Sequence, residues 1–317
     1  MLFKTEPEFR DRLQECLPGI RAVFNESGDV SRIDPATAAD TVIIFGNPPA
    51  EFLKTCPNLQ WLQLQSAGAN GFVSGEVGSQ VKVTCATGGY GHAVSEHMVA
   101  LTLALYKKLH LYRDEQNKRR WQSQGAVKSI QGAVTVILGM GDIGNQYARR
   151  MKGLGAYIIG IRRTEQPKPD YADEQFLADK LDEILPRADI LALILPGVQS
   201  TEGIINRERL NRMKHGATLI NAGRGSAVDQ EALIDALASG HLGGAGLDVT
   251  DPEPLPPEHR LWNTENALIT PHVAGGRHLP ETERYIMQLN LENARRFTLN
   301  EPLKSLVDMK TGYAARF

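Results

Sequence analysis

Residues 134–161 hold the feature that most constrains how this chain can fold. An apolar run, VTVILG, leads into glycines at Gly139, Gly141 and Gly144, and then into the helix-like stretch NQYARRMKGLG. A second apolar run, AYIIGI, follows at 156–161. Both runs are apolar at consecutive positions, which is typical of strands buried on both faces of a parallel sheet. We therefore expect two parallel strands joined by a helix.

The same alternation of short apolar runs and helix-like stretches covers almost the whole chain, and it predicts an α/β fold with parallel sheets. The letters MLFK at the start leave the presence of an N-terminal strand open. Strands are expected at RAVFN (21–25), TVIIFG (41–46), LQWLQLQ (59–65), VKVTC (81–85), VTVILG (134–139), AYIIGI (156–161), ILALIL (190–195), ATLINAG (217–223), GAGLDV (244–249) and ALIT (267–270).

A chain of 317 residues is long enough for two domains, each with its own core. Two long helix-like stretches stand apart from the alternation, one from near Ala93 to about Arg119 and one from about Leu279 to Phe297. We interpret them as the connections between the domains, with a ligand expected in the cleft between the two. The predicted domains are 99–276 and the discontinuous pair 1–98 and 277–317.

The composition excludes several classes of protein. Apolar residues make up 42% and charged residues 23%, as in ordinary globular proteins, and the net charge of −2 gives no reason to expect a nucleic-acid or membrane partner. The longest apolar runs are too short to span a bilayer, and the mixed charges of MLFKTEPEFRDRL are unlike a signal peptide. His92, Glu96 and His97 lack the spacing of metal ligands, so no metal is expected. We expect a soluble, cytoplasmic protein.

The glycine-rich turn has the pattern of a dinucleotide-binding site. The first glycine permits a tight turn, the second lets the backbone approach a pyrophosphate, and the third lets helix and strand pack closely. The helix that follows offers free N–H groups to the phosphates. A structural glycine turn is the alternative, but the strand before the motif and the helix and strand after it favour a cofactor. The predicted contacts are Gly139, Met140, Gly141, Asp142, Ile143 and Gly144.

The end of the second strand indicates which dinucleotide is bound. An acidic residue that binds the adenine ribose usually lies about 20 residues beyond the glycines. Here Ile161 is followed by Arg162, Arg163 and Thr164, and no carboxylate is expected at that position. Two guanidinium groups and a hydroxyl suit a phosphate monoester, so we expect NADP(H) to be preferred. If the arginines only solvate the strand end, NAD(H) is used instead.

Three further segments carry polar groups that a fold alone would not require. Arg224 lies between two glycines in LINAGRGSAVD, Glu253 lies between two prolines in GLDVTDPEPLP, and His272 follows a proline in ALITPHVAGG. Functional groups collect at strand ends of this kind in open α/β sheets. The plain alternative for each residue is a surface ion pair or a hydrogen-bonded histidine.

These motifs, taken in order, resemble those of the D-isomer-specific 2-hydroxyacid dehydrogenase family, and nearly the whole chain takes part. The resemblance is greatest to the glyoxylate/hydroxypyruvate reductase branch. It implies a Rossmann-type dinucleotide-binding domain and a smaller flavodoxin-like substrate domain. The matching motifs are SAGANG (66–71), VSEH (94–97), GMGDIG (139–144), INAGRGSAVD (220–229), DVTDPEPLP (248–256) and TPHVAGG (270–276).

The resemblance implies catalytic roles for three residues. Arg224 would bind the carboxylate and carbonyl of a 2-keto acid, since its planar, permanently charged fork suits them. His272 would protonate the carbonyl oxygen as hydride arrives at the keto carbon. Glu253 would pair with His272, and a neighbouring carboxylate favours the protonated form of an imidazole.

The resemblance also implies less specific matches. Ala67 and Gly68 would bind the substrate carboxylate through backbone N–H groups, with help from Ser66 and Asn70, although a plain turn also favours such residues. Homodimerisation through the cofactor domain is implied in the same way. Further cofactor contacts would come from Leu195, Pro196, Ala222 and Asp248, with the capping of a helix or turn as an equal alternative for Asp248.

We therefore expect an NADPH-dependent reductase that converts small 2-keto acids, of the glyoxylate or hydroxypyruvate type, to D-2-hydroxy acids. One alternative is the same reaction on a bulkier keto acid or with NAD(H). Another is a dinucleotide-sensing scaffold like the co-repressor branch of the family, although the chain lacks a long extension that would recruit partners.

Overall fold

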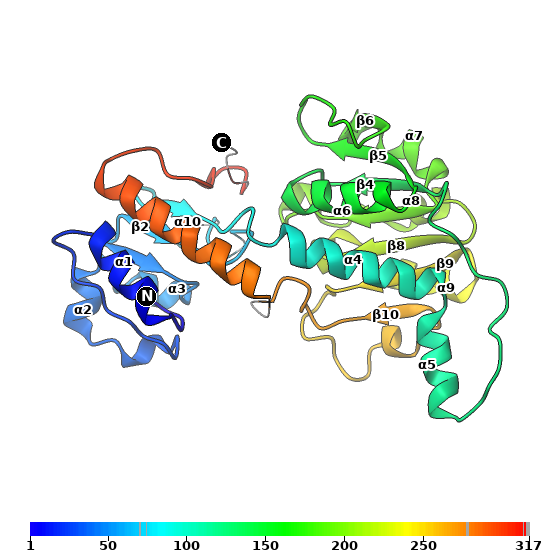
Figure 1. Ribbon diagram of the computed structural model, residues 1–317, viewed down its shortest axis with the longest axis horizontal. Helices are drawn as coiled ribbons and strands as arrows, with labels where there is room; N and C mark the ends of the chain where they lie inside the picture. The colour runs from blue at the N-terminus through cyan, green and yellow to red at the C-terminus, as the bar shows by residue number, and fades with distance from the viewer. Residues whose placement is uncertain (70, 74, 277–278, 313, 315–317) are drawn as a thin grey trace. The chain divides into compact units, whose positions relative to one another are not determined.

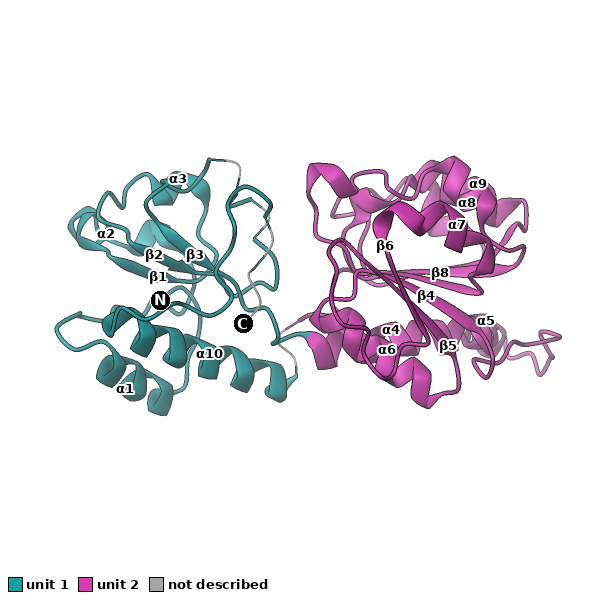
Figure 2. Cartoon of the chain, turned by 90° about the horizontal axis from the view of Figure 1, so that it is seen from above, with its two compact units in different colours: residues 1–90, 277–317 teal, residues 91–276 magenta. Residues whose placement is uncertain are grey.

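The computed structural model describes residues 1–69, 71–73, 75–276, 279–312 and 314. The chain forms two compact units, residues 1–90 with 277–317 and residues 91–276, which Figure 2 distinguishes by colour. It enters the larger unit at the first residue of α4 (Gly91–Tyr106). The predicted α/β class with parallel sheets is confirmed.

The larger unit is built on a seven-stranded sheet in the order β10-β9-β8-β7-β4-β5-β6, with every neighbouring pair parallel. From β4 the chain adds β5 and β6 on one side and then places β7 to β10 on the other. Open α/β sheets bind ligands outside the carboxyl ends of the strands where this direction changes, here between β4 and β7. The strands are β4 (Val134–Leu138), β5 (Tyr157–Arg162), β6 (Glu174–Leu177), β7 (Ile190–Leu193), β8 (Ala217–Asn221), β9 (Leu242–Leu247) and β10 (Ala267–Ile269).

Helices cover both faces of this sheet, with α4 and α6 on one face and α7, α8 and α9 on the other (Figure 2). Among the described residues, every helix is too short or too polar to cross a lipid bilayer. Besides α4, the helices of this unit are α5 (Leu109–Asn117), α6 (Asp142–Gly153), α7 (Leu181–Ile184), α8 (Arg207–Arg212) and α9 (Gln230–Ala238), with 3-10 helices at Ala178–Lys180, Leu185–Arg187, Gln199–Thr201, Gly225–Ala227 and Arg260–Asn263.

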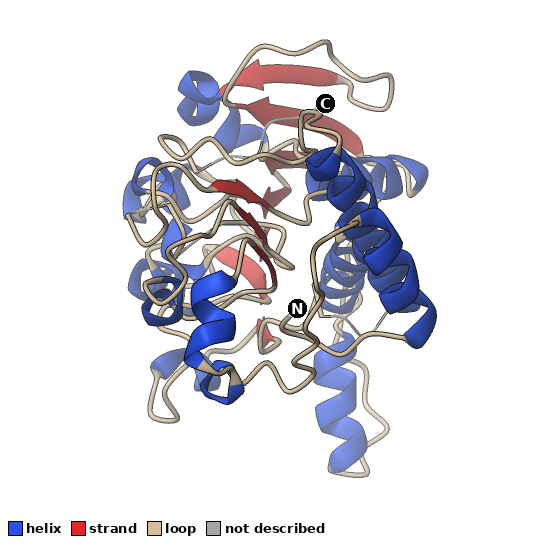
Figure 3. Cartoon of the chain, turned by 90° about the vertical axis from the view of Figure 1, so that its left-hand side faces the viewer, coloured by secondary structure: helices blue, strands red, loops and turns tan. Residues whose placement is uncertain are grey.

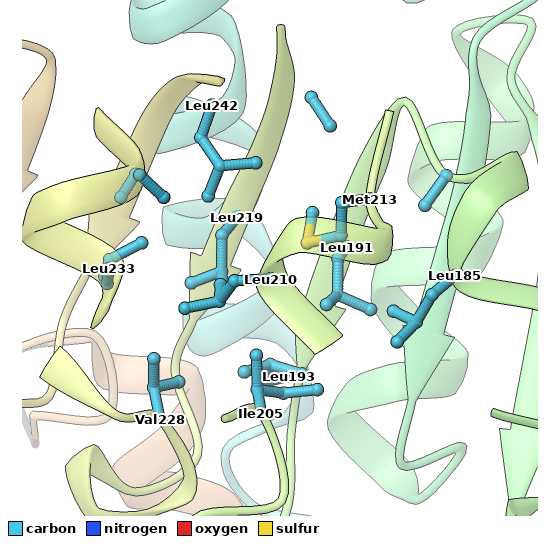
Figure 4. Close-up of a cluster of buried hydrophobic side chains, with 14 of the residues drawn as sticks. Leu185, Leu191, Leu193, Ile205, Leu210, Met213, Leu219, Val228, Leu233 and Leu242 are labelled. Carbon is cyan, nitrogen blue, oxygen red and sulfur yellow. The ribbon is translucent and has the colours of Figure 1, made fainter. Parts of the chain in front are cut away.

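The apolar runs of the sequence supply the core of this unit. Leu191 and Leu193 of β7 and Leu219 of β8 pack with Leu210 of α8 and Leu233 of α9 (Figure 4). All four residues of β7 are buried, because helices cover both faces of the sheet. Burial on both faces explains why the strands are apolar at consecutive positions.

The smaller unit contains a three-stranded parallel sheet in the order β1-β2-β3. Trp61 of β2 is fully buried, where its ring packs edge-on against Phe45 and stacks on Phe297 of α10. Its indole N–H donates a hydrogen bond to Thr84 Oγ1 (2.8 Å). The elements are β1 (Ile43–Phe45), β2 (Trp61–Gln63), β3 (Lys82–Thr84), α1 (Pro7–Cys16), α2 (Pro35–Asp40), α3 (Ala50–Leu53) and α10 (Pro280–Thr298), with a 3-10 helix at Val30–Arg32.

The strand expected at 21–25 is wrong, since residues 17–29 form neither helix nor strand. Figure 3 colours the helices, strands and loops of the chain. Asn25 N–H donates to the Met1 carbonyl (2.9 Å), and Leu2 N–H donates to the Phe45 carbonyl (2.8 Å). The first residues therefore lie beside β1, and Asn25 lies beside Met1, but these isolated bonds do not form a ladder. Residues 1–4 form no strand either.

Two other sequence expectations differ from the structure. The long helix expected from Ala93 to Arg119 is divided into α4 and α5, because Lys108 adopts a left-handed backbone with φ of 57° (Figure 1). Strand β6 was not expected, because its sequence EQFL is polar at two of its positions. It forms by pairing in parallel with β5.

Candidate active site

The loops after β4, β7, β8, β9 and β10 leave the same edge of the seven-stranded sheet, because the strands are parallel. The fold thereby places distant parts of the sequence along one edge. The candidate residues on these loops are Gly139–Gly144 after β4, Leu195 and Pro196 after β7, Ala222 and Arg224 after β8, Asp248 and Glu253 after β9, and His272 after β10.

The glycine turn leaves no room for a side chain at Gly139 or Gly144. Gly139 has a φ of 108°, and a Cβ there would lie 2.3 Å from the Ile194 carbonyl oxygen. A Cβ at Gly144 would lie 2.1 Å from the Gly139 carbonyl oxygen. Gly141 precedes the first residue of α6 and offers no side chain to cap the helix. The first-turn N–H groups can therefore face a ligand, and the turn fits a dinucleotide pyrophosphate.

The other residues of this turn differ in exposure. Met140 is buried, and its side chain fills the space beside Gly160 of β5, where a Cβ would lie 2.9 Å from Met140 Cγ. Asp142 and Ile143 are half-buried in the first turn of α6. Met140 thus contributes to the core between the glycine turn and β5.

Arg162, at the end of β5, is held by two neighbouring elements. Its Nε donates to Gln175 Oε1 of β6 (2.8 Å), and its Nη2 donates to Asn145 Oδ1 of α6 (3.3 Å). Arg163 and Thr164 follow on the exposed loop. The Arg162 guanidinium is therefore fixed close to the first turn of α6.

The loop after β5 also carries a carboxylate. Glu165 directly follows Thr164 and lines an open pocket of about 490 Å³. Glu165 is thus a carboxylate next in sequence to the three residues expected to bind the 2′-phosphate. The other lining residues are Gln166, Pro167, Gln175, Phe176 and Leu177.

Sequence reasoning also missed Gln175 and Asn145 as partners of Arg162. Asn145 carries a usable signal, since it directly follows the last glycine of the motif in the first turn of a predicted helix. Gln175 carries none, because β6 itself was not expected.

The side chains of Glu253 and His272 meet. His272 Nδ1 lies 2.8 Å from Glu253 Oε2, and Thr250 N–H donates to Glu253 Oε1 (3.1 Å). An ionised carboxylate can only accept hydrogen bonds, so Nδ1 of His272 carries the proton shared with Glu253. The other ring nitrogen, Nε2, is then the atom able to exchange a proton with a ligand.

Arg224 belongs to the same cluster. It directly follows Gly223 in the loop after β8, and its Nη1 donates to the Gly223 carbonyl (2.6 Å). Burial lowers the pKa of its guanidinium, and the charge of Glu253 acts in the opposite direction. Because a guanidinium remains protonated, a half-buried cation lies beside the Glu253–His272 pair. The three side chains chosen from the sequence are brought together.

The other candidate cofactor contacts, Ala222, Leu195 and Pro196, lie in the loops after β8 and β7. Ala222 N–H donates to the Leu193 carbonyl (3.2 Å), and a Cβ at Gly223 would lie 2.6 Å from the Leu195 nitrogen. Pro196 accepts a hydrogen bond from Thr201 Oγ1 through its carbonyl (2.6 Å). The loops after β7 and β8 are therefore in direct contact.

Ala67 and Gly68 lie in the smaller unit, in the turn after β2. The Ala67 carbonyl accepts from Thr87 Oγ1 (3.1 Å), and the Gly68 carbonyl accepts from Ser66 Oγ (2.6 Å). These bonds fix the turn through its carbonyl groups. Asn70 lies outside the described residues. Within the described ranges, no group of three His, Cys, Asp or Glu side chains could hold a metal ion.

Comparison with known proteins shows the family to which this chain belongs. Residues 99–274 match the NAD-binding domain of D-isomer specific 2-hydroxyacid dehydrogenases. The chain belongs to the D-isomer specific 2-hydroxyacid dehydrogenase family. As a member it is an oxidoreductase of 2-hydroxy and 2-keto acids that uses a nicotinamide dinucleotide.

Relatives in this dehydrogenase family span most of the chain. A hydroxypyruvate reductase of Blautia hydrogenotrophica is 27% identical over 92% of this chain and 92% of the relative. A glyoxylate/hydroxypyruvate reductase B of Erwinia tasmaniensis is 34% identical over 74% of both chains. An NADPH-dependent glyoxylate/hydroxypyruvate reductase of Sinorhizobium meliloti, solved with NADP and sulfate, has a TM-score of 0.81 at 26% identity and covers 98% of both chains.

Proposed function

We propose that this dehydrogenase reduces small 2-keto acids, of the glyoxylate or hydroxypyruvate type, to D-2-hydroxy acids with NADPH as the preferred reductant. The contact between His272 and Glu253 beside the half-buried Arg224 carries the proposal. The glycine turn at the same edge of the sheet supports it, as do the names of the Blautia, Erwinia and Sinorhizobium relatives.

Each residue of the cluster has a separate role. Arg224 binds the carboxylate of the keto acid with its planar fork. His272 donates a proton from Nε2 to the carbonyl oxygen, while Glu253 stabilises the imidazolium through Nδ1. The bound reduced nicotinamide supplies the hydride. In the reverse direction His272 accepts the proton of the hydroxyl group.

Residues at the end of β5 support the proposed preference for NADPH. Arg162, fixed by Gln175 and Asn145, and the exposed Arg163 and Thr164 provide two cations and a hydroxyl for a 2′-phosphate. Glu165 opposes this preference if its side chain faces the ribose, so the arginines must outweigh one nearby carboxylate.

The smaller unit contributes to substrate binding, and each unit forms one domain of the enzyme. Backbone N–H groups of Ala67 and Gly68 bind the substrate carboxylate. The larger unit, residues 91–276, forms the cofactor domain, and residues 1–90 with 277–317 form the substrate domain, so the domain boundary lies at the start of α4 rather than at the expected boundary of 98/99. The protein functions in the cytoplasm as a homodimer that associates through the cofactor domain.

A steady-state panel tests the proposed activity. Glyoxylate, hydroxypyruvate, pyruvate, phenylpyruvate and 2-ketopantoate are each assayed with NADPH and NADH. The largest kcat/KM is expected for glyoxylate or hydroxypyruvate with NADPH. A preference for phenylpyruvate or 2-ketopantoate would support a bulkier substrate, and no turnover with any keto acid would leave a dinucleotide-sensing role.

Replacing both Arg162 and Arg163 with alanine tests the cofactor preference. The KM for NADPH should rise by about tenfold or more, because charge-assisted bonds to the 2′-phosphate are lost, while the KM for NADH changes little. Arg149→Ala is the control, since it removes an exposed arginine of α6 that stacks on Tyr171. An equal rise for both cofactors would contradict the assignment.

A further inference from the structure

His272 adopts a backbone conformation that side chains seldom take. Its φ is 52°, in the left-handed region, where a residue with a Cβ is strained. Such a conformation persists only when the surrounding structure holds it in place. The turn from Thr270 to Ala274 must therefore contain groups that fix it.

Asp248 supplies most of this fixation. It is 2% exposed, and it follows β9 directly. Its Oδ1 accepts from Val273 N–H (3.0 Å), its Oδ2 accepts from Ala274 N–H (3.0 Å), and its backbone carbonyl accepts from His272 N–H (2.8 Å). One buried residue thus binds three successive N–H groups of the turn that carries His272.

Thr270 and His97 complete the network. Thr270 Oγ1 donates its single proton to Asp248 Oδ1 (2.6 Å). Toward His97 Nε2, which lies 2.9 Å away, Thr270 Oγ1 can therefore only accept a hydrogen bond. Nε2 of His97 therefore carries a proton, and it also lies 3.6 Å from Asp248 Oδ1. His97 comes from α4, far from β9 and β10 in the sequence.

We propose that Asp248, Thr270 and His97 are positioning residues, which keep the turn closed so that His272 Nδ1 meets Glu253 and Nε2 faces the substrate. Their role rests on the proposed function of His272 as the proton donor. Asp248 acts here on the His272 turn, and both of its carboxylate oxygens are already engaged within the protein.

Thr270→Val and Thr270→Ser separate positioning from general packing. Valine keeps the shape of threonine but removes the hydroxyl, so kcat should fall by roughly tenfold while the KM for NADPH stays unchanged. Serine keeps the hydroxyl and should retain the wild-type kcat. Hydrogen–deuterium exchange of the 270–276 segment should rise in Thr270→Val and remain at the wild-type level in Thr270→Ser.

Asp248→Asn strengthens the test. An asparagine side chain offers one acceptor oxygen and an NH₂ donor, so its NH₂ group would face one of the donors now bound by the carboxylate. Both the loss of kcat and the gain in exchange should exceed those of Thr270→Val. Equal or smaller effects of Asp248→Asn would overturn its place as the centre of the network.

Thr135→Val is the matched control, because Thr135 Oγ1 is buried in β4 and has no hydrogen-bond partner among the described residues. This variant should keep the wild-type kcat and exchange. If Thr270→Val behaves like Thr135→Val, or if Thr270→Ser loses as much kcat as Thr270→Val, the network does not position His272. Should the protein reduce no keto acid, exchange in the 270–276 segment still decides whether the network exists, so failure of the two proposals can be told apart.

Discussion

Hydrogen bonds fix the orientation of the Glu253 and His272 side chains. One carboxylate oxygen is bound by Thr250 N–H and the other by the imidazole. Because Nδ1 is occupied in this way, only Nε2 of His272 can serve a ligand. The His272 side chain is 47% exposed, so a substrate can reach this nitrogen.

Replacing His272 with alanine tests this assignment directly. The kcat for keto acid reduction should fall by roughly 10²–10⁴-fold, since general acid catalysis contributes about that much. The dissociation constant for NADPH, measured by fluorescence titration, should stay near the wild-type value because the glycine turn is intact. His215→Ala, at an exposed histidine after α8, serves as the control. Near-normal turnover of His272→Ala would remove it from the mechanism.

Sequence reasoning could find Arg224, Glu253 and His272 because each lies in a distinctive segment at the end of an expected strand. It could not find the left-handed backbone of His272 or its support by His97. The contact between His97 and Thr270 depends on how α4 packs on the sheet, and no local pattern encodes that packing.

The segment of β4 and α6 allowed the most detailed prediction of local structure from the sequence. Each glycine of the motif has a different role. Gly144 sets the distance between α6 and β4, because a Cβ there would meet the Gly139 carbonyl oxygen. A backbone atom cannot move aside as a flexible side chain can. Gly153, the last residue of α6, has nothing within 4 Å of its Cβ position.

Gly144→Ala and Gly153→Ala should therefore change stability in opposite directions. Gly144→Ala should lower the free energy of unfolding by roughly 1–3 kcal/mol, because the added methyl group overpacks the turn. Gly153→Ala should raise it by up to about 1 kcal/mol, because alanine favours the helix over glycine. Urea denaturation followed by circular dichroism measures both. A stable Gly144→Ala protein would show that helix and strand can separate freely.

Expected strands and observed strands agree best where both faces of the sheet are covered. The runs that became β4, β5, β7 and β8 are apolar at consecutive positions, and burial on both faces requires this. Residues 21–25 have a similar β-rich composition, yet they form no strand, because a strand also requires a neighbour that offers a continuous ladder. Partners of this kind are not visible in a single run of residues.

Several exposed apolar side chains lie in and around the segment that joins α5 to β4. The loop after α5 projects from the rest of the larger unit and leads to β4 (Figure 1). Trp121 on this loop is fully exposed, and Leu109, Tyr112 and Val127 nearby in the sequence are also exposed. Trp121 and Tyr112 line an open pocket of about 640 Å³. Exposed tryptophan is enriched at protein interfaces, so this surface is the candidate contact of the proposed homodimer.

Sedimentation velocity tests this contact. The wild-type protein should sediment as a dimer at micromolar concentration, and Trp121→Ala should shift it toward the monomer, because a central aromatic side chain typically contributes about 2 kcal/mol or more to an interface. Trp262→Ala is the control, since Trp262 is also exposed but its indole N–H is bound to the Pro256 carbonyl. A monomeric wild-type protein would contradict the proposed dimer. Equal dissociation of the dimer by both variants would show that the loop after α5 is not its specific contact.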